Sequence, residues 1–275
     1  MRNGFTGPNT NWVQYFFDGN QVTVPTVVSA MPFAHIDSSC MKKIQLEIWS
    51  DIACPFCYIG KRRLEAALAQ FTHHDEVEVR WRSFELAPNE PTAVNRNLYE
   101  VLAERKGMSV PQARQMSSQV AQQAASAGLT FDFEHVVPAN TFNAHRLIHL
   151  AAAHNRQDAM KERLLRAYFT EGQNIDDVPT LLKLAGEAGL NVLETQQVLA
   201  SDAYTQEVRH DEYQARQIGV RGVPYFVFNN KYAVSGAQPS ELFHEVLEKV
   251  WAEAQPATVQ LSGSEGAACD IDDNC

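Results

Sequence analysis

The sequence predicts an α/β protein in which a strand–helix–strand unit and a strand–strand–helix unit flank a long all-helical segment. Two observations predict this class. Short runs that alternate apolar and polar residues, typical of half-buried strands, occur in residues 43–84 and again in residues 223–235. The residues between these two regions have helical periodicity instead. With 275 residues, 45% of them hydrophobic, the chain can bury one large core or a core with a helical lobe.

The first unit is predicted from three consecutive segments. Residues 43–49 alternate as a strand, residues 57–71 place apolar side chains on one helical face, and residues 77–84 alternate again. A strand, a helix and a strand of these lengths form a βαβ unit with parallel strands.

The middle of the chain contains no sustained strand pattern. Glycine and proline divide it into helical stretches, as expected of helix boundaries. The predicted helices are residues 97–105, 110–127, 142–154, 161–170, 179–188, 192–200 and 204–218.

The last unit begins with a strand at residues 223–228. Asn229-Asn230 then predicts a tight turn into a strand at 231–235, and an amphipathic helix follows at 240–253. The βαβ and ββα units together predict a thioredoxin fold with a large helical insertion. The predicted divisions are 41–87 with 219–254 for the thioredoxin-like domain and 88–218 for the inserted helical domain.

The two ends of the chain differ in composition from this body. Residues 1–40 are rich in Asn, Gly, Thr and Pro, and we expect a non-native or disordered extension with Met41 as the natural start. An ordered N-terminal arm is the alternative. Residues 255–275 have linker composition and predict a flexible tail. The tail carries Cys269 and Cys275.

The chemistry is predicted from Cys54-Pro55-Phe56-Cys57, which lies between the first strand and the first helix. This placement puts Cys54 at the first turn of a helix, where unpaired N–H groups and the helix dipole favour a thiolate. Cys57 lies one turn further on and can close a disulfide that releases a bound partner. Zinc binding would need further cysteines or histidines at ligand spacing, which the body lacks. An inert structural disulfide is the other alternative.

Pro224 supplies the second part of the predicted site. Proline cannot donate to a sheet ladder, so Pro224 must begin a strand, and X–Pro bonds are the ones commonly found in the cis form. A cis Val223–Pro224 bond facing Cys54 would block metal binding and offer the Val223 backbone to an extended substrate. A trans proline at an ordinary strand start is the alternative.

Three separated motifs carry a family resemblance: residues 50–61 (SDIACPFCYIGK), 140–147 (NTFNAHRL) and 219–224 (GVRGVP). With them, residues 41–252 resemble the DsbA family of thioredoxin-like proteins, and its FrnE-like branch in particular. The resemblance implies Cys54 as attacking thiol, Cys57 as resolving thiol and Pro224 as cis proline. It also implies that Asn140 and His145, with Pro55, Phe56 and Val223, lie near the substrate.

Glu47, on the first strand, resembles the buried acid that moves a proton to the resolving thiol in many thioredoxin-like proteins. A solvated strand residue beside Gln45 is the equal alternative, since alternation places both on one face. We interpret Lys61, Arg62 and Arg63 as a solvated helix face. His145 and His149 are spaced like metal ligands, but no third ligand accompanies them, so no metal site is predicted.

The tail cysteines Cys269 and Cys275 predict a regulatory or relay dithiol, because a linker from residue 255 reaches on the order of 20 Å. Capture of a soft metal and a tail without a role are alternatives. FrnE-like proteins often carry such a cysteine pair.

The formal net charge of −10 argues against a nucleic-acid surface and against binding to anionic membranes. The predicted function is a cytoplasmic thiol–disulfide oxidoreductase or isomerase acting on protein or small-molecule thiols and disulfides. It needs no cofactor beyond the redox dithiol, with glutathione as a possible co-substrate. The alternatives are a glutathione-dependent isomerase or kappa-class-like glutathione transferase, and a redox-sensing, chaperone-like binding module. Oligomeric state, substrate and direction of electron flow stay open.

Overall fold

The structure is a computed structural model that describes residues 13–15 and 43–254. Among them are strands β1 (Val13–Tyr15), β2 (Ile44–Ser50), β3 (Val77–Ser83), β4 (Tyr225–Phe228) and β5 (Tyr232–Ser235), and helices α1 (Pro55–Gln70), α2 (Leu98–Lys106), α3 (Val110–Ser126), α4 (Phe142–Ala153), α5 (Gln157–Phe169), α6 (Val178–Glu187), α7 (Val192–Leu199), α8 (Thr205–Gln217) and α9 (Ser240–Ala254). Cys40, Cys269 and Cys275 lie outside the described residues, as do the tail and nearly all of the predicted extension.

The strands form one mixed sheet in the order β1-β5-β4-β2-β3. β2 pairs in parallel with β3 and antiparallel with β4, and β4 pairs antiparallel with β5. The predicted βαβ and ββα units are therefore both present, and together they confirm the thioredoxin fold. The three-residue strand β1, which pairs in parallel with β5, was not predicted.

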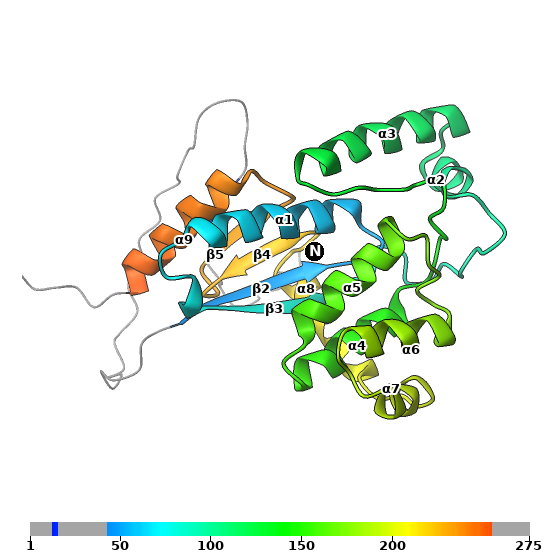
Figure 1. The fold of residues 1–275 in the computed structure, drawn as a ribbon. Helices are drawn as coiled ribbons and strands as arrows, with labels where there is room; N and C mark the ends of the chain where they lie inside the picture. Colours follow the sequence, from blue (N-terminus) through cyan, green and yellow to red (C-terminus); the bar gives the residue numbers. More distant parts are fainter. Residues whose placement is uncertain (1–12, 16–42, 255–275) are drawn as a thin grey trace, which may run out of the picture.

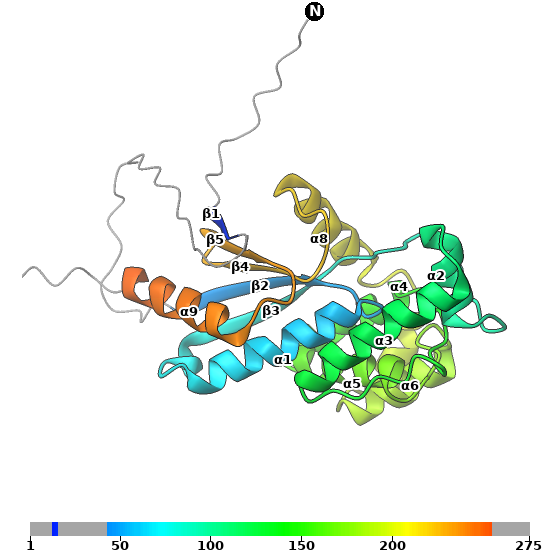
Figure 2. The same cartoon turned by 90° about the horizontal axis from the view of Figure 1, so that it is seen from above.

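The two faces of the sheet are covered by different helices. Figure 2 shows α1 and α9 on one face and α8 on the other. The even-numbered residues of β2, such as Leu46 and Ile48, are fully buried under α1 and α9, as their alternation predicts. The odd-numbered residues face α8, whose Asp211 carbonyl accepts a hydrogen bond from the Trp49 indole at 2.9 Å.

The inserted helices α2 to α7 gather beyond the end of the sheet at which β2 stops and α1 begins (Figure 1). One apolar core runs from the sheet into this insertion without interruption: Ile48 and Ile59 belong to the same cluster as Leu147 and Leu164. The insertion therefore lies against the beginning of α1, where the two cysteines are. Among the described helices, none is both long and apolar enough to cross a membrane.

Polar side chains cap the N-termini of several inserted helices. Asn97 and Ser109 form capping boxes with Glu100 and Gln112, and Asp177 caps α6. The predicted boundaries differ from the observed ones by a few residues. The largest shift is at α5, which begins at Gln157 rather than Lys161.

Candidate active site

The two cysteines occupy the first turn of α1. Cys54 is the N-cap residue and Pro55 is the first helical residue, where its missing N–H costs no hydrogen bond. The Cys57 N–H donates to the Cys54 carbonyl at 3.1 Å, which closes the first turn. Both thiols are free, and both residues are buried, Cys54 at 4% and Cys57 at 1% exposure. Of the two, Cys54 is the more accessible.

The Val223–Pro224 peptide bond is cis, as predicted from the sequence. It faces the dithiol, because the Cys54 thiol donates a hydrogen bond to the Val223 carbonyl at 3.5 Å. The Pro224 carbonyl accepts from the Gly236 N–H at 2.8 Å, which ties this turn to the end of β5. Gly60 on α1 permits the close approach, since a Cβ there would lie 3.0 Å from Pro224 Cγ.

Three buried polar side chains that come from separate elements lie beneath the sulfurs. Asp51, in the turn between β2 and α1, accepts from the Leu86 N–H at 2.8 Å, and its other oxygen lies 3.3 Å from His145 Nε2. Lys161, on α5, donates to the Ser50 carbonyl at 3.4 Å. Asp51, His145 and Lys161 are each 1% exposed.

The two thiols interact so closely that they titrate as one hydrogen-bonded pair. The hydrogen bond to Cys57, burial and the charges of Cys57 and Asp51 raise the pKa of Cys54. Burial also acts to raise the pKa of Cys57, but hydrogen bonds from Cys54 and Ser50 and the charge of Lys161 outweigh it, so its pKa is lowered. Moving the shared proton from Cys54 to Cys57 places the thiolate on the more accessible sulfur.

The three polar residues under the dithiol differ in charge. Burial acts to raise the pKa of Asp51, but the hydrogen bonds from His145 and the Leu86 N–H and the charge of Lys161 outweigh it, so this carboxylate stays ionised. Burial lowers the pKa of His145, which favours the neutral imidazole. Burial also lowers the pKa of Lys161 to about 8, against the opposing attraction of Cys57, Asp51 and Cys54. At neutral pH the cluster holds one ammonium and one carboxylate besides the sulfurs.

Glu47 does not lie in this cluster, so the predicted acid beside Cys57 is wrong. The Glu47 carboxylate is ion-paired with Arg82, with 2.8 Å between Glu47 Oε1 and Arg82 Nε, and Arg82 also binds Asp211 of α8. Glu47 therefore sits on the α8 face of the sheet, whereas Ser50 and the dithiol lie on the α1 side. The acid that the sequence analysis missed is Asp51, three residues before Cys54.

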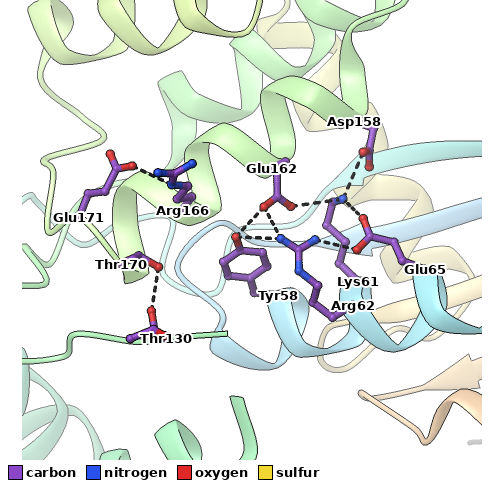
Figure 3. Close-up of polar contacts among 10 residues, drawn as sticks. All are labelled: Tyr58, Lys61, Arg62, Glu65, Thr130, Asp158, Glu162, Arg166, Thr170 and Glu171. Carbon is purple, nitrogen blue, oxygen red and sulfur yellow. Dashed lines mark hydrogen bonds and ion pairs between the residues drawn. The ribbon is translucent and has the colours of Figure 1, made fainter. Parts of the chain in front are cut away.

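The basic run after Cys57 is not a solvated helix face, which corrects a second expectation. Lys61 is 2% exposed, and it pairs with Glu65, with Asp158 at 3.1 Å and with Glu162 at 3.3 Å. Arg62 binds Glu65 and Glu162, and the Tyr58 hydroxyl donates to Glu162 at 2.6 Å. Figure 3 shows these side chains joining α1 to α5. This ion-pair cluster holds α5 against the helix that carries the cysteines.

The residues that were expected at the substrate surface differ in accessibility. Phe56 is 38% exposed beside Cys54, and Pro55 and Val223 are partly exposed. His145 is buried against Asp51, so the structure does not place it where a substrate could touch it. Asn140 is partly exposed; its amide donates to the Glu90 carbonyl at 3.0 Å, and its oxygen accepts from the Phe142 N–H at 3.0 Å. Asn140 therefore joins the start of α4 to the segment around Glu90.

A cavity of about 410 Å³ opens beside the cysteine turn. It is bounded by Asp51 and Ala53 of that turn, by residues of the 86–96 segment and of α2, and by Tyr168 of α5. Arg105 and Glu90, both in its lining, form an ion pair with each other. The cavity has apolar walls and charged groups at its edge, as small-molecule sites commonly do.

Sequence reasoning had no signal for Lys161. It is one lysine of a helix that also presents Asp158 and Glu162, and such a pattern is ordinary on a solvated face. Asp51 could have been found, because it lies within the motif that carries the cysteines.

Comparisons with known proteins agree with this geometry. The family model described as a DSBA-like thioredoxin domain matches residues 45–248. A crystal structure of a probable DsbA oxidoreductase from Streptomyces coelicolor is 41% identical, covers 82% of this chain and 99% of its own, and has a TM-score of 0.73. YwbO from Bacillus subtilis is 26% identical over 208 residues, which are 74% of this chain and 96% of YwbO. The cytosolic disulfide reductase DsbM from Pseudomonas aeruginosa is 20% identical, covers 74% of this chain and 97% of its own with a TM-score of 0.51, and so shares the fold.

Proposed function

The chain belongs to the family of DSBA-like thioredoxin domains, and from that premise we propose that it exchanges disulfides through an attack by Cys54 that Cys57 resolves. The observation that carries the proposal is the free, hydrogen-bonded thiol pair at the start of α1, with the more accessible sulfur facing the carbonyl before a cis proline. Thiolate formation and access decide which sulfur attacks.

The exchange balances in two steps. The Cys54 thiolate attacks one sulfur of a partner disulfide, the partner's S–S bond breaks, and its other sulfur leaves as a thiolate that takes up a proton. Cys57, once deprotonated, then attacks Cys54 Sγ; this breaks the mixed disulfide and releases the second partner sulfur. The partner gains two electrons and becomes a dithiol, while Cys54 and Cys57 become a disulfide. The reverse sequence oxidises a partner, and attack without resolution by Cys57 permits isomerisation.

We infer that protein and small-molecule thiols are the partners. An extended peptide could pair with the Val223 backbone while its side chains contact the exposed Phe56. The cavity of about 410 Å³ beside Ala53, the residue before Cys54, has the size of a small-molecule site. DsbM of Pseudomonas aeruginosa has been solved with GSH, which makes glutathione the first small thiol to test here. We also propose that the protein is cytoplasmic. DsbM, which shares the fold, is named as a cytosolic disulfide reductase.

Trapping of the mixed disulfide tests the proposal. The full chain, Cys57→Ser and Cys54→Ser are exposed to glutathione disulfide, and each cysteine is read separately by peptide mass spectrometry. We expect a Cys54–Cys57 disulfide in the wild type and a stable glutathione adduct on Cys54 in Cys57→Ser. Cys54→Ser should acquire the adduct on Cys57 much more slowly, because that sulfur is 1% exposed. Equal adduct rates in the two variants, or no exchange in the wild type, would overturn the proposal.

A further inference from the structure

Lys161 is buried without the ion pairs that usually accompany a buried ammonium. Among the described residues, no carboxylate lies within ion-pair distance of its Nζ; the contacts found there are the Ser50 carbonyl at 3.4 Å and the face of Trp81, with the ring centroid at 5.5 Å. Lys61, which is equally buried, pairs with three carboxylates. Burial of an unpaired lysine is costly, so a lysine in this position points to a purpose other than stability.

The groups that face Lys161 come from every element around it. The turn after β2 contributes Asp51 and the Ser50 carbonyl, and α1 contributes Cys54, Cys57 and, further away, Lys61. α4 contributes His145, which is neutral, and β3 contributes Trp81. Asp51 is already engaged by His145 and by the Leu86 N–H. Among these groups, the one whose charge changes in a redox cycle is the thiol pair.

We propose that Lys161 is the counter-charge of the thiolate that the Cys54–Cys57 pair forms on reduction, so that the inserted helical domain sets the acidity of the dithiol. This proposal rests on the proposed function. When the disulfide takes up two electrons and one proton it becomes one thiol and one thiolate, and the buried site gains one negative charge. The Lys161 ammonium stabilises that charge, whereas in the disulfide form it faces Asp51 alone. Lys161 thereby favours the reduced pair and makes the disulfide the better oxidant.

Lys161 acts through the sulfurs, so it is a positioning residue rather than a catalytic one. The ion-pair cluster of Tyr58, Lys61, Arg62, Glu65, Asp158 and Glu162 fixes its place, since Glu162 is the next residue along α5. Because Lys161 lies on α5, the acidity of the thiols also depends on how α5 packs against α1.

The test is the pH profile of thiol alkylation, read for each cysteine in the full-length reduced protein. In Lys161→Met we expect the apparent pKa of the pair to rise by roughly one unit, which means an alkylation rate about tenfold lower at neutral pH. The equilibrium with glutathione, measured at a pH above the apparent thiol pKa of both proteins, should shift by about tenfold toward the disulfide. Lys161→Arg keeps the charge and should restore most of the wild-type alkylation rate and most of the wild-type equilibrium with glutathione. Lys183→Met is the control: it removes a lysine of the same inserted helical domain whose side chain is 62% exposed and pairs with Glu187, and we expect it to leave the thiol profile unchanged.

An unchanged thiol profile in folded Lys161→Met would overturn the proposal. If that variant does not fold, the pKa of Lys161 is measured in the wild type from ¹⁵N spectra of the lysine ammonium groups, with Lys161→Arg used to assign the signal. We expect a higher pKa for Lys161 in the reduced protein than in the oxidised protein. Equal values in the two states would likewise overturn it. Failure of the proposed function would look different, because the wild type itself would then form no reversible disulfide with glutathione.

Discussion

The thiol of Cys54 and the carbonyl of Val223 are 169 residues apart in the chain and form a hydrogen bond of 3.5 Å. This contact joins the start of α1 to the turn before β4. It also favours the protonated form of Cys54, because a carbonyl can accept a hydrogen bond from the thiol but not from the thiolate. Binding of a substrate strand to the Val223 backbone would compete for the same region.

The first prediction concerns this hydrogen bond. Cys54→Ser retains a donor to Val223, whereas Cys54→Ala removes it. We expect Cys54→Ser to match the reduced wild type in free energy of unfolding and Cys54→Ala to be about 1 kcal/mol less stable. Urea denaturation under reducing conditions measures both. If the two variants are equally stable, the hydrogen bond contributes nothing to folding.

The second prediction concerns the packing of α1 against the cis proline. A Cβ at Gly60 would lie 3.0 Å from Pro224 Cγ and 3.2 Å from Phe226 Cζ. We expect Gly60→Ala to destabilise the protein by about 1–3 kcal/mol through this crowding, although alanine favours a helix. Gly186→Ala is the control, since its Cβ would meet only Val192 Cγ2, at 3.2 Å. Thermal unfolding compares the two variants. Equal losses of stability would show that Pro224 moves aside for the new Cβ without destabilising the protein.

The third prediction follows from the pKa of Lys161, which burial lowers from 10.5 to about 8. Between these values the unfolded chain binds more protons than the folded one, so this residue makes stability rise with pH across that window. The stability gained in this way is complete above pH 10.5, the pKa of the lysine in the unfolded chain, and it is lost as the pH falls through about 8, the pKa in the folded protein. Integrated over the window, it is on the order of 3 kcal/mol.

The difference in unfolding free energy between Lys161 and Lys161→Met, both measured in a Cys54→Ser, Cys57→Ser background, isolates this effect, because the dithiol that Lys161→Met also perturbs no longer titrates. We expect the protein that keeps Lys161 to gain on the variant from pH 7.5 to 10. A difference that stays constant over this range would contradict a lowered pKa at Lys161.

The fourth prediction concerns Asp51, whose charge helps to raise the pKa of Cys54. Asp51→Asn removes that charge and keeps a group that can accept from the Leu86 N–H. We expect the apparent pKa of the thiol pair to fall, in the direction opposite to Lys161→Met, and Cys54 to be alkylated faster at neutral pH. Ultraviolet thiolate absorbance against pH measures the shift. Glu47→Gln is the control, because Glu47 lies on the other face of the sheet and should leave the profile unchanged.

The fifth prediction concerns Cys269 and Cys275, which lie outside the described residues. If they relay electrons to the Cys54–Cys57 pair, ending the chain before residue 255 will alter the rate at which Cys54 is oxidised by a peptide disulfide. The double variant Cys269→Ser, Cys275→Ser should reproduce the change, which separates the thiols from the length of the tail. Unchanged kinetics in both would end the relay hypothesis.

Local sequence rules determined the parts of this site that depend on neighbours in the chain. Cys54 before Pro55 is a helix start, the alternation of β2 places Ile48 inward, and Pro224 opens a strand where a cis bond is tolerated. The same alternation could have located Glu47, because the apolar face of β2 is the face that α1 covers. The family motifs added the roles of Cys54 and Cys57, which remain proposals.

Only the tertiary structure decided the charges around the sulfurs. Lys161 lies 104 residues after Cys57, and it reaches the dithiol because the apolar core continues from the sheet into the insertion. The same packing buries Lys61 among carboxylates and turns His145 toward Asp51. A pKa depends on burial and on charges a few ångströms away, and neither is encoded by residue type or local spacing. The sequence by itself thus determined where the cysteines lie, and the packing of the inserted helices against α1 and the sheet decided which charges surround them.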